Sequence, residues 1–146
     1  MEKGTTLTRF IVEEERRYPE ATGEFTSLLS KLTIAGKIIA REVNKAGLAD
    51  IMGITSRRNV HGEEVQKLDE FDNATIIRGT DHTGHLAGMV SEEMEDHFPI
   101  PEKHIQGNYI LVFDSVDGSS NIDVNVSIGA IFSIFRKKSP SGVGLG

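Results

Sequence analysis

The chain of 146 residues has the length of one domain, and its 38% of hydrophobic residues is enough to build a core. Its net charge of −6 gives no general attraction to nucleic acid or to an anionic membrane, so we expect neither as a partner. Cysteine is absent, which excludes disulfide and thiolate chemistry, and no apolar run or N-terminal leader is long enough for membrane insertion or secretion. We therefore expect a cytoplasmic protein.

Two helices are predicted in the first third of the chain. Residues 6–17 form a short helix that ends before Pro19. In residues 23–47, apolar side chains recur at every third or fourth position, which is typical of a helix with one buried face. This stripe consists of Phe25, Leu28, Leu29, Leu32, Ala35, Ile39 and Val43. Thr22 can cap the start of this helix, and Gly47 marks its end.

The middle of the chain, from about residue 53 to residue 108, is predicted to be less regular. It begins as a loop and becomes helical from Glu63. The side chains that we expect to face partly inward are Val65, Leu68, Ala74 and Ile77. Residues 86–90 form a short buried strand, and residues 96–108 form a loop that contains two prolines.

The last third of the chain is predicted to be β-structure. Residues 109–114 are short and apolar, as in a strand buried on both faces, whereas residues 122–128 alternate and residues 130–135 continue that pattern. Residues 137–146 form a loop tail. The whole pattern predicts a layered α/β fold in which N-terminal helices pack on a mixed sheet.

Acidic residues follow two of the predicted strands. Glu92 and Glu93 come after residues 86–90, while Asp114 ends the next strand and Asp117 follows one tight turn later. If the two strands are parallel neighbours, Glu92, Asp114 and Asp117 meet at one edge of the sheet. Carboxylates about 4 Å apart repel by roughly 4 kcal/mol per pair at an effective dielectric constant near 20. A Mg²⁺ ion, which prefers oxygen ligands, would offset that repulsion.

The residues after Asp117 suit a phosphate group. Gly118 allows the backbone to approach a ligand closely, and Ser119 and Ser120 can donate hydrogen bonds to it. An ordinary structural role explains the same residues, because Asp-Gly is common turn chemistry and Ser-Glu-Glu can cap a helix. Local spacing leaves both explanations open.

The order of these motifs resembles a known enzyme superfamily. Asp69, the pair Glu92–Glu93 and the stretch DSVDGSS at residues 114–120 are similar to the signature of the metal-dependent, lithium-sensitive sugar and inositol phosphatases. Within this superfamily, five longer segments of the chain resemble segments of class I fructose-1,6-bisphosphatase. They occur in the same order and together span nearly the whole chain. They are GTTLTRFIVEEERR, TGEFTSLLSKL, GEEVQKLDEFDNATI, VSEEMED and DGSSNIDVNVSIGAIFSIFRK.

The resemblance implies a fold and a domain organisation. Residues 1–146 would be the N-terminal domain of a layered α/β sandwich of the sugar-phosphatase type, with residues 137–146 as a loop tail. Members of this family are roughly twice as long, so the second domain would be missing here. We therefore expect the chain alone to be inactive.

The resemblance also implies roles for individual residues. Glu92, Asp114, Asp117 and the carbonyl of Val116 would bind two or more Mg²⁺ ions, for which Mn²⁺ could substitute. The catalytic residues would be Asp69 and Glu93, which activate water, and Glu63, which assists a further metal or the leaving group. The 1-phosphate of fructose 1,6-bisphosphate would be held by Asp117, Gly118, Ser119 and Ser120. Three positions depart from the family pattern: Ser115 replaces a proline, Val116 a leucine or isoleucine, and Glu63 an aspartate.

A second site is implied at the start of the helix at residues 23–47. In the resembling family this place binds the phosphate of the inhibitor AMP. The matching residues here are Thr22, Gly23, Glu24, Phe25, Thr26, Tyr109 and Arg136. The family's lysine is Asn108, so we expect weaker inhibition. From the residues alone, simple helix capping explains Thr22 better than a phosphate site does.

The resemblance further implies a homotetramer that acts in gluconeogenesis, within carbohydrate metabolism. The alternatives are a phosphatase for sedoheptulose bisphosphate or an inositol phosphate, and a truncated regulatory or subunit-pairing domain without catalysis. Asp81, His82 and His85 have metal-like spacing, but no third ligand lies nearby in the sequence, so we expect no zinc site there.

Overall fold

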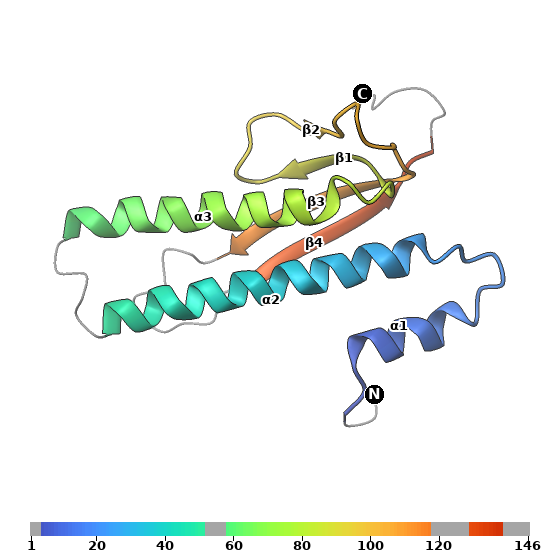
Figure 1. The fold of residues 1–146 in the computed structure, drawn as a ribbon, viewed down its shortest axis with the longest axis horizontal. Coiled ribbons are helices and arrows are strands. Elements are labelled where there is room, and N and C mark those ends of the chain that lie inside the picture. The colour runs from blue at the N-terminus through green and yellow to red at the C-terminus, as the bar shows by residue number, and fades with distance from the viewer. Residues whose placement is uncertain (1–3, 52–57, 118–128, 139–146) are drawn as a thin grey trace.

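The computed structural model describes residues 4–51, 58–117 and 129–138. Within these ranges three helices come first in the chain and four strands follow. The helices are α1 (Leu7–Glu15), α2 (Glu24–Ile51) and α3 (Arg58–Thr80), and the strands are β1 (Leu86–Ser91), β2 (Phe98–Pro99), β3 (Tyr109–Asp117) and β4 (Gly129–Arg136). In Figure 1 the long helices α2 and α3 lie side by side against the sheet, and α1 lies against the first part of α2. The expected layered α/β arrangement is confirmed.

The strands form one mixed sheet in the order β2-β1-β3-β4. The central strands β1 and β3 are parallel, with Val90 opposite Val112 and Ser91 opposite Phe113. Strands β2 and β4 each run antiparallel to their neighbour. The parallel pairing that was expected for the two strands with acidic ends is therefore present.

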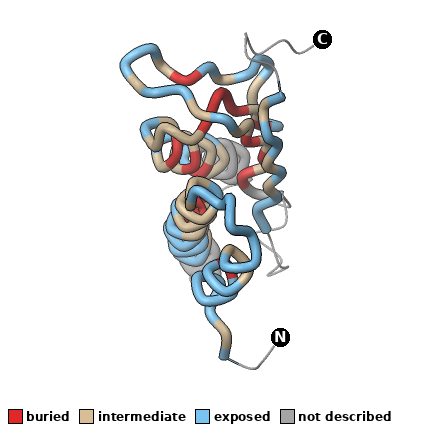
Figure 2. Tube along the Cα trace, turned by 90° about the vertical axis from the view of Figure 1, so that its right-hand side faces the viewer, coloured by how far each residue is buried: buried red, intermediate tan, exposed pale blue. Residues whose placement is uncertain are grey.

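The core lies between the helices and one face of the sheet, where Figure 2 shows the buried segments gathered. Its buried members are Leu28, Leu32, Ala35, Ile39, Ile76, Leu86, Met89, Ile100, Leu111 and Phe113. The stripe predicted on α2 supplies four of them, and Leu29 and Val43 pack against the cluster. Phe25 is 45% exposed and instead contacts the ring of Tyr109, with ring centroids 6.1 Å apart.

The boundaries predicted for the two long helices were wrong. Helix α2 continues past Gly47 to Ile51, since a glycine costs only about 1 kcal/mol inside a helix. Its first backbone bond runs from the amide of Ser27 to the carbonyl of Gly23, so Gly23, with φ of +79°, holds the cap position that was predicted for Thr22. Helix α3 begins at Arg58, which places Glu63 inside the helix and not in a loop before it.

The end of α3 is held against β1 by a buried threonine. Thr80 is fully buried, and its hydroxyl donates to the carbonyl of Ile76 at 2.8 Å and lies 3.3 Å from the sulfur of Met89. A hydroxyl satisfied by its own helix can be buried at little cost. This contact fixes where α3 sits, and therefore where its acidic residues lie relative to the strand ends.

Strand β3 differs from the prediction in two ways. Its burial alternates, because helices cover only one face of the sheet: Leu111, Phe113 and Ser115 are buried, whereas Val112 and Asp114 are only half-buried. The strand also continues to Asp117, and its register with β4 shifts between Asp114 and Asp117 where a tight turn was expected. Serine at position 115 keeps the backbone N–H that a proline would remove from a strand.

The remaining predictions concern the loops and the C-terminal part. The proline-containing loop at residues 96–108 includes the short strand β2, which was not predicted. The strand predicted at residues 130–135 is confirmed as β4. The strand predicted at residues 122–128 and most of the tail lie outside the described residues. Among the helices described, none combines the length and the hydrophobicity that crossing a bilayer requires.

Candidate active site

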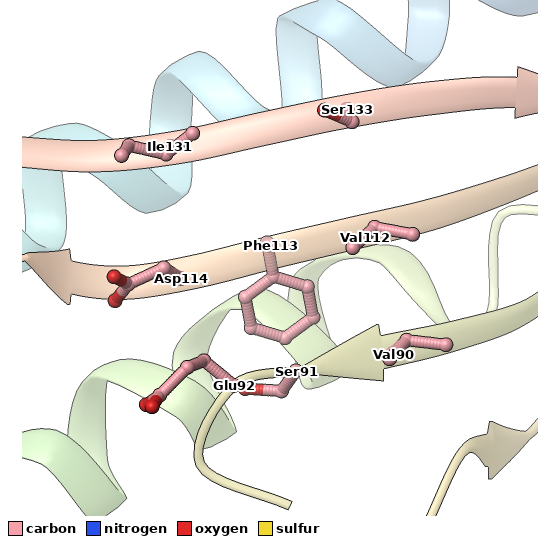
Figure 3. A pocket seen from close by; sticks show the side chains of 8 residues that line it. All are labelled: Val90, Ser91, Glu92, Val112, Phe113, Asp114, Ile131 and Ser133. Atoms are coloured by element: carbon pink, nitrogen blue, oxygen red, sulfur yellow. The ribbon is translucent and has the colours of Figure 1, made fainter.

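The parallel strands β1 and β3 end side by side, and acidic side chains follow at that edge. The amide of Glu92 donates to the carbonyl of Phe113 at 3.1 Å, which continues the pairing one residue beyond β1. A hollow of about 270 Å³ lies on the sheet face opposite the helices. Figure 3 shows the carboxylates of Glu92 and Asp114 at one end of this hollow, with Ile131 across from Asp114 and with Val90 and Val112 towards the other end. Two of the expected metal ligands therefore flank a common space.

Glu93 is electrostatically coupled to the acids around it. Its amide donates to the hydroxyl of Ser91 at 3.3 Å, which sets the backbone just after β1. Partial loss of hydration raises the pKa of the Glu93 carboxyl, and the nearby carboxylates of Asp69, Glu92 and Asp114 raise this pKa further. Asp69 on α3 is therefore close enough to the strand ends to act on Glu93, so α3, the residues just after β1 and strand β3 all contribute acids to one region.

The structure brings together four of the predicted site residues, Asp69, Glu92, Glu93 and Asp114. Val116 and Asp117 are placed as the last residues of β3, but their side chains lie outside the description, as does that of Glu63 in α3. The predicted phosphate-binding residues Gly118, Ser119 and Ser120 also lie outside the described residues.

The donor set at this edge suits a hard divalent cation. The groups that converge are carboxylates whose mutual repulsion a cation would relieve, and oxygen ligands are those that Mg²⁺ and Mn²⁺ prefer. In the described part of the chain, no group of three or more histidine or acidic side chains is close enough to hold a metal ion. Val116 and Asp117, whose side chains lie outside the description, stay predicted ligands of such a site.

The histidines of the loop after α3 are held by neighbours in the same region. Nδ1 of His82 lies 3.2 Å from a carboxylate oxygen of Asp81, and its ring meets that of His104 edge-on, with centroids 6.4 Å apart. These contacts account for the conformation of His82 without a ligand.

A larger pocket of about 620 Å³ lies between α1, the start of α2 and the near ends of β3 and β4. All seven residues that were matched to the nucleotide site line this pocket, together with Asn108. The hydroxyl of Thr26 donates to Glu15 at 2.8 Å and so ties α2 to α1 across it. The charged side chains around it are Glu14, Glu15, Glu20, Glu24 and Arg136. The acids of α1 were not predicted as lining residues, because nothing in a charged helix face indicates what folds back onto it.

A buried acid beside the site was also missed. Asp72 lies one helical turn after Asp69 and is completely buried, although the sequence pattern around it is that of an exposed polar helix. The only available signal was its spacing of four residues from Ile76, which is fully buried on the same face of α3.

The sequence and the fold were compared with those of known proteins. Residues 5–144 match the family described as Fructose-1-6-bisphosphatase, N-terminal domain. The chain is 52% identical over 142 residues to the class 1 fructose-1,6-bisphosphatase of Maridesulfovibrio salexigens, which covers 97% of this chain and 42% of that protein. It is 54% identical over 134 residues to that of Chlorobium luteolum, covering 92% of this chain and 40% of that protein.

The fold is similar to that of Leishmania major fructose-1,6-bisphosphatase in its holo form, with a TM-score of 0.75 and 28% identity, over 95% of this chain and 40% of that one. The chain thus spans about 40% of the length of the proteins it matches. The sequence match extends over nearly the whole chain, and the fold matches that of a solved member of the same family over 95% of the chain. The chain therefore belongs to the class 1 fructose-1,6-bisphosphatase family and corresponds to its N-terminal domain.

Proposed function

We propose that the chain provides the metal-binding part of an active site that hydrolyses the 1-phosphate of fructose 1,6-bisphosphate, giving fructose 6-phosphate and phosphate. The observation that carries this proposal is the convergence of acids from α3, from the residues just after β1 and from β3 at the carboxyl ends of two parallel strands. Uncatalysed hydrolysis of a phosphate monoester is so slow that enzymes accelerate it by up to about 10²¹-fold. A catalyst for it needs an activated water and stabilisation of the charge that develops on the phosphoryl group.

Each acid has a part in this proposal. Glu92, Asp114, Asp117 and the carbonyl of Val116 hold two or more Mg²⁺ ions, with Mn²⁺ as a substitute, and these ions supply charge stabilisation and acidify water when bound. Asp69 and Glu93 orient the attacking water and accept its proton.

The other roles in the proposal follow the family pattern. Gly118, Ser119 and Ser120 hold the 1-phosphate together with Asp117, and Glu63 assists a further metal or the leaving group from within α3. The sugar and the 6-phosphate are bound by chain beyond the part that is matched here, since the relatives are more than twice as long. We propose that the protein that contains this domain acts in gluconeogenesis and assembles as a homotetramer.

The proposal is tested in a hybrid enzyme in which this chain replaces the matching N-terminal part of the Maridesulfovibrio salexigens relative. We expect Mg²⁺-dependent phosphate release from fructose 1,6-bisphosphate that exceeds release from sedoheptulose bisphosphate or inositol phosphate. Replacement of Asp114 by alanine should lower kcat by at least about 10³-fold, because the loss of a metal ligand removes several kcal/mol of charge stabilisation. The control is Asp96→Ala, which removes an exposed acid from the loop after β1.

Two outcomes would contradict this proposal. Near-normal turnover of the Asp114→Ala hybrid would exclude that residue as a metal ligand. An unmutated hybrid that folds but releases no phosphate from any of the three substrates would favour the non-catalytic alternative, a regulatory or subunit-pairing domain.

We also propose that the 620 Å³ pocket beside α1 binds AMP as an inhibitor. The observation that favours it is that all seven matched residues, from α2, β3 and β4, line one pocket. The amides at the start of a helix bind anions well, and Arg136 adds a positive charge. Because the same pocket has four glutamates and Asn108 in place of the family's lysine, we expect this binding to be weak.

A further inference from the structure

Asp72 is a buried acid without a partner in the described part of the structure. Its side chain is 0% exposed, and neither of its carboxyl oxygens has a hydrogen-bond partner there. An ionised carboxylate in such surroundings is very unfavourable, because it loses its hydration and gains nothing in return. A carboxyl group in this position therefore tends to keep its proton.

The charged groups that act on Asp72 also favour the neutral form. They are Asp69 on its own helix and Glu42 on α2, and both are carboxylates. Glu42 is itself paired with Lys45, at 2.6 Å. Of the strands that contact α3, β1 carries no titratable side chain, and the titratable residues of β3 are Tyr109, Asp114 and Asp117. Burial first, then Asp69 and Glu42, raise the pKa of Asp72 to about 7.

The position of Asp72 links it to the candidate active site. Residues three apart on a helix lie on the same face, so Asp72 sits between Asp69 and the fully buried Ile76. Asp69 in turn acts on Glu93 at the end of β1. A charge on Asp72 would thus be placed one helical turn from the acid that the proposed reaction uses as a base.

We propose that Asp72 is a positioning residue that works as a neutral carboxylic acid. While neutral, it adds no charge beside Asp69 and allows the helix to lie against the sheet. When it ionises, repulsion by Asp69 and Glu42 and the uptake of water loosen the contact between α2 and α3, and Asp69 shifts away from Glu93. The catalytic part of this inference rests on the proposed function, whereas the neutral state of Asp72 does not.

The neutral state is tested on the 146-residue chain by infrared difference spectroscopy of the unmutated protein against Asp72→Asn. A protonated carboxyl group has a carbonyl band distinct from that of a carboxylate. We expect this band at about pH 5.5 and its loss by about pH 8.5, on either side of the pKa of Asp72. If the band is missing at pH 5.5, Asp72 is ionised and the inference is wrong. Asp72→Ser, a second neutral variant, serves as the reference if the asparagine variant does not fold.

The positioning role is tested by the pH dependence of kcat in the hybrid enzyme with and without Asp72→Asn. We expect the ratio of unmutated to variant kcat to fall at least about threefold between pH 6 and pH 8.5, with KM changed less, because only the unmutated enzyme acquires a charge at this position. In the control, Glu70→Gln on the exposed side of α3, the ratio should stay constant. A constant ratio for Asp72→Asn would overturn the positioning role. A hybrid that folds but is inactive even without a substitution would instead count against the proposed hydrolysis. The infrared result would then decide the protonation state of Asp72.

Discussion

The burial of Asp72 should make the stability of the fold depend on pH in a direction unusual for an aspartate. Its pKa is about 7 in the folded protein, whereas the ordinary pKa of an exposed aspartate is 3.8. Between these two values the folded chain retains a proton that the unfolded chain has released. Its contribution to stability is therefore complete below about pH 4, decreases as the pH rises, and is lost once the pH exceeds about 7.

The size of this effect follows from the shift in pKa. Each pKa unit corresponds to about 1.4 kcal/mol, so the shift of roughly three units amounts to about 4 kcal/mol between pH 4 and pH 8. This is a large part of the 5–15 kcal/mol that stabilises a typical domain. A substitution that removes the titrating group without changing its shape, Asp72→Asn, should abolish this part of the pH dependence.

The measurement is urea unfolding followed by circular dichroism at a series of pH values and one fixed protein concentration. The informative quantity is the free energy of unfolding of the unmutated chain minus that of Asp72→Asn, in which the other titrating groups cancel. We expect this difference to fall by about 1.4 kcal/mol per pH unit from about pH 5 to pH 7 and then to level off. Glu70→Gln should give a flat difference. A flat difference for Asp72→Asn would show that the carboxyl is solvated in the folded protein and that the reasoning from its burial is wrong.

Three further predictions concern other parts of the molecule. Asn108→Lys in the hybrid enzyme should tighten inhibition by AMP about tenfold or more, since a charge-assisted contact contributes about 1.5–3 kcal/mol; an unchanged inhibition constant would contradict the proposed nucleotide site. Gly107→Ala should destabilise the chain by about 3 kcal/mol or more in urea unfolding, because the added Cβ would lie 2.1 Å from the carbonyl carbon of His85, a backbone atom that no side-chain rotation can move. Gly36→Ala, where nothing lies within 4 Å, is its control, and equal effects of the two substitutions would refute the explanation. The chain alone should elute as an oligomer in gel filtration with light scattering and lack fructose-1,6-bisphosphatase activity, because Ile131 and Phe135, 56% and 57% exposed, lie on β4, an edge strand of the sheet that the structure describes; a monomer that turns over faster than about 1 s⁻¹ would contradict both expectations.

The sequence by itself was sufficient to predict the features that depend on local patterns. The apolar spacing of Leu28, Leu32, Ala35 and Ile39 identified the buried face of α2, because a helix repeats every 3.6 residues whatever surrounds it. The short apolar runs before Glu92 and Asp114 identified β1 and β3. Their parallel pairing was an assumption of the metal-site argument, and the structure shows that it holds.

Other features were decided only by what packs against each segment. Helix α2 continues to Ile51 and strand β3 to Asp117 in spite of a helical glycine and an Asp-Gly turn signal, because such local preferences amount to only about 1 kcal/mol. The pocket beside α1 exists because α1 folds back along α2, where Glu15 accepts a hydrogen bond from Thr26. No prediction was made for Asp72, because a single acid among polar residues of a helix gives no apolar pattern that marks it as buried. Asp72 is buried because α3 packs against α2 and the sheet, which removes water from its carboxyl group. The same burial raises its pKa to about 7, although aspartate side chains are usually exposed.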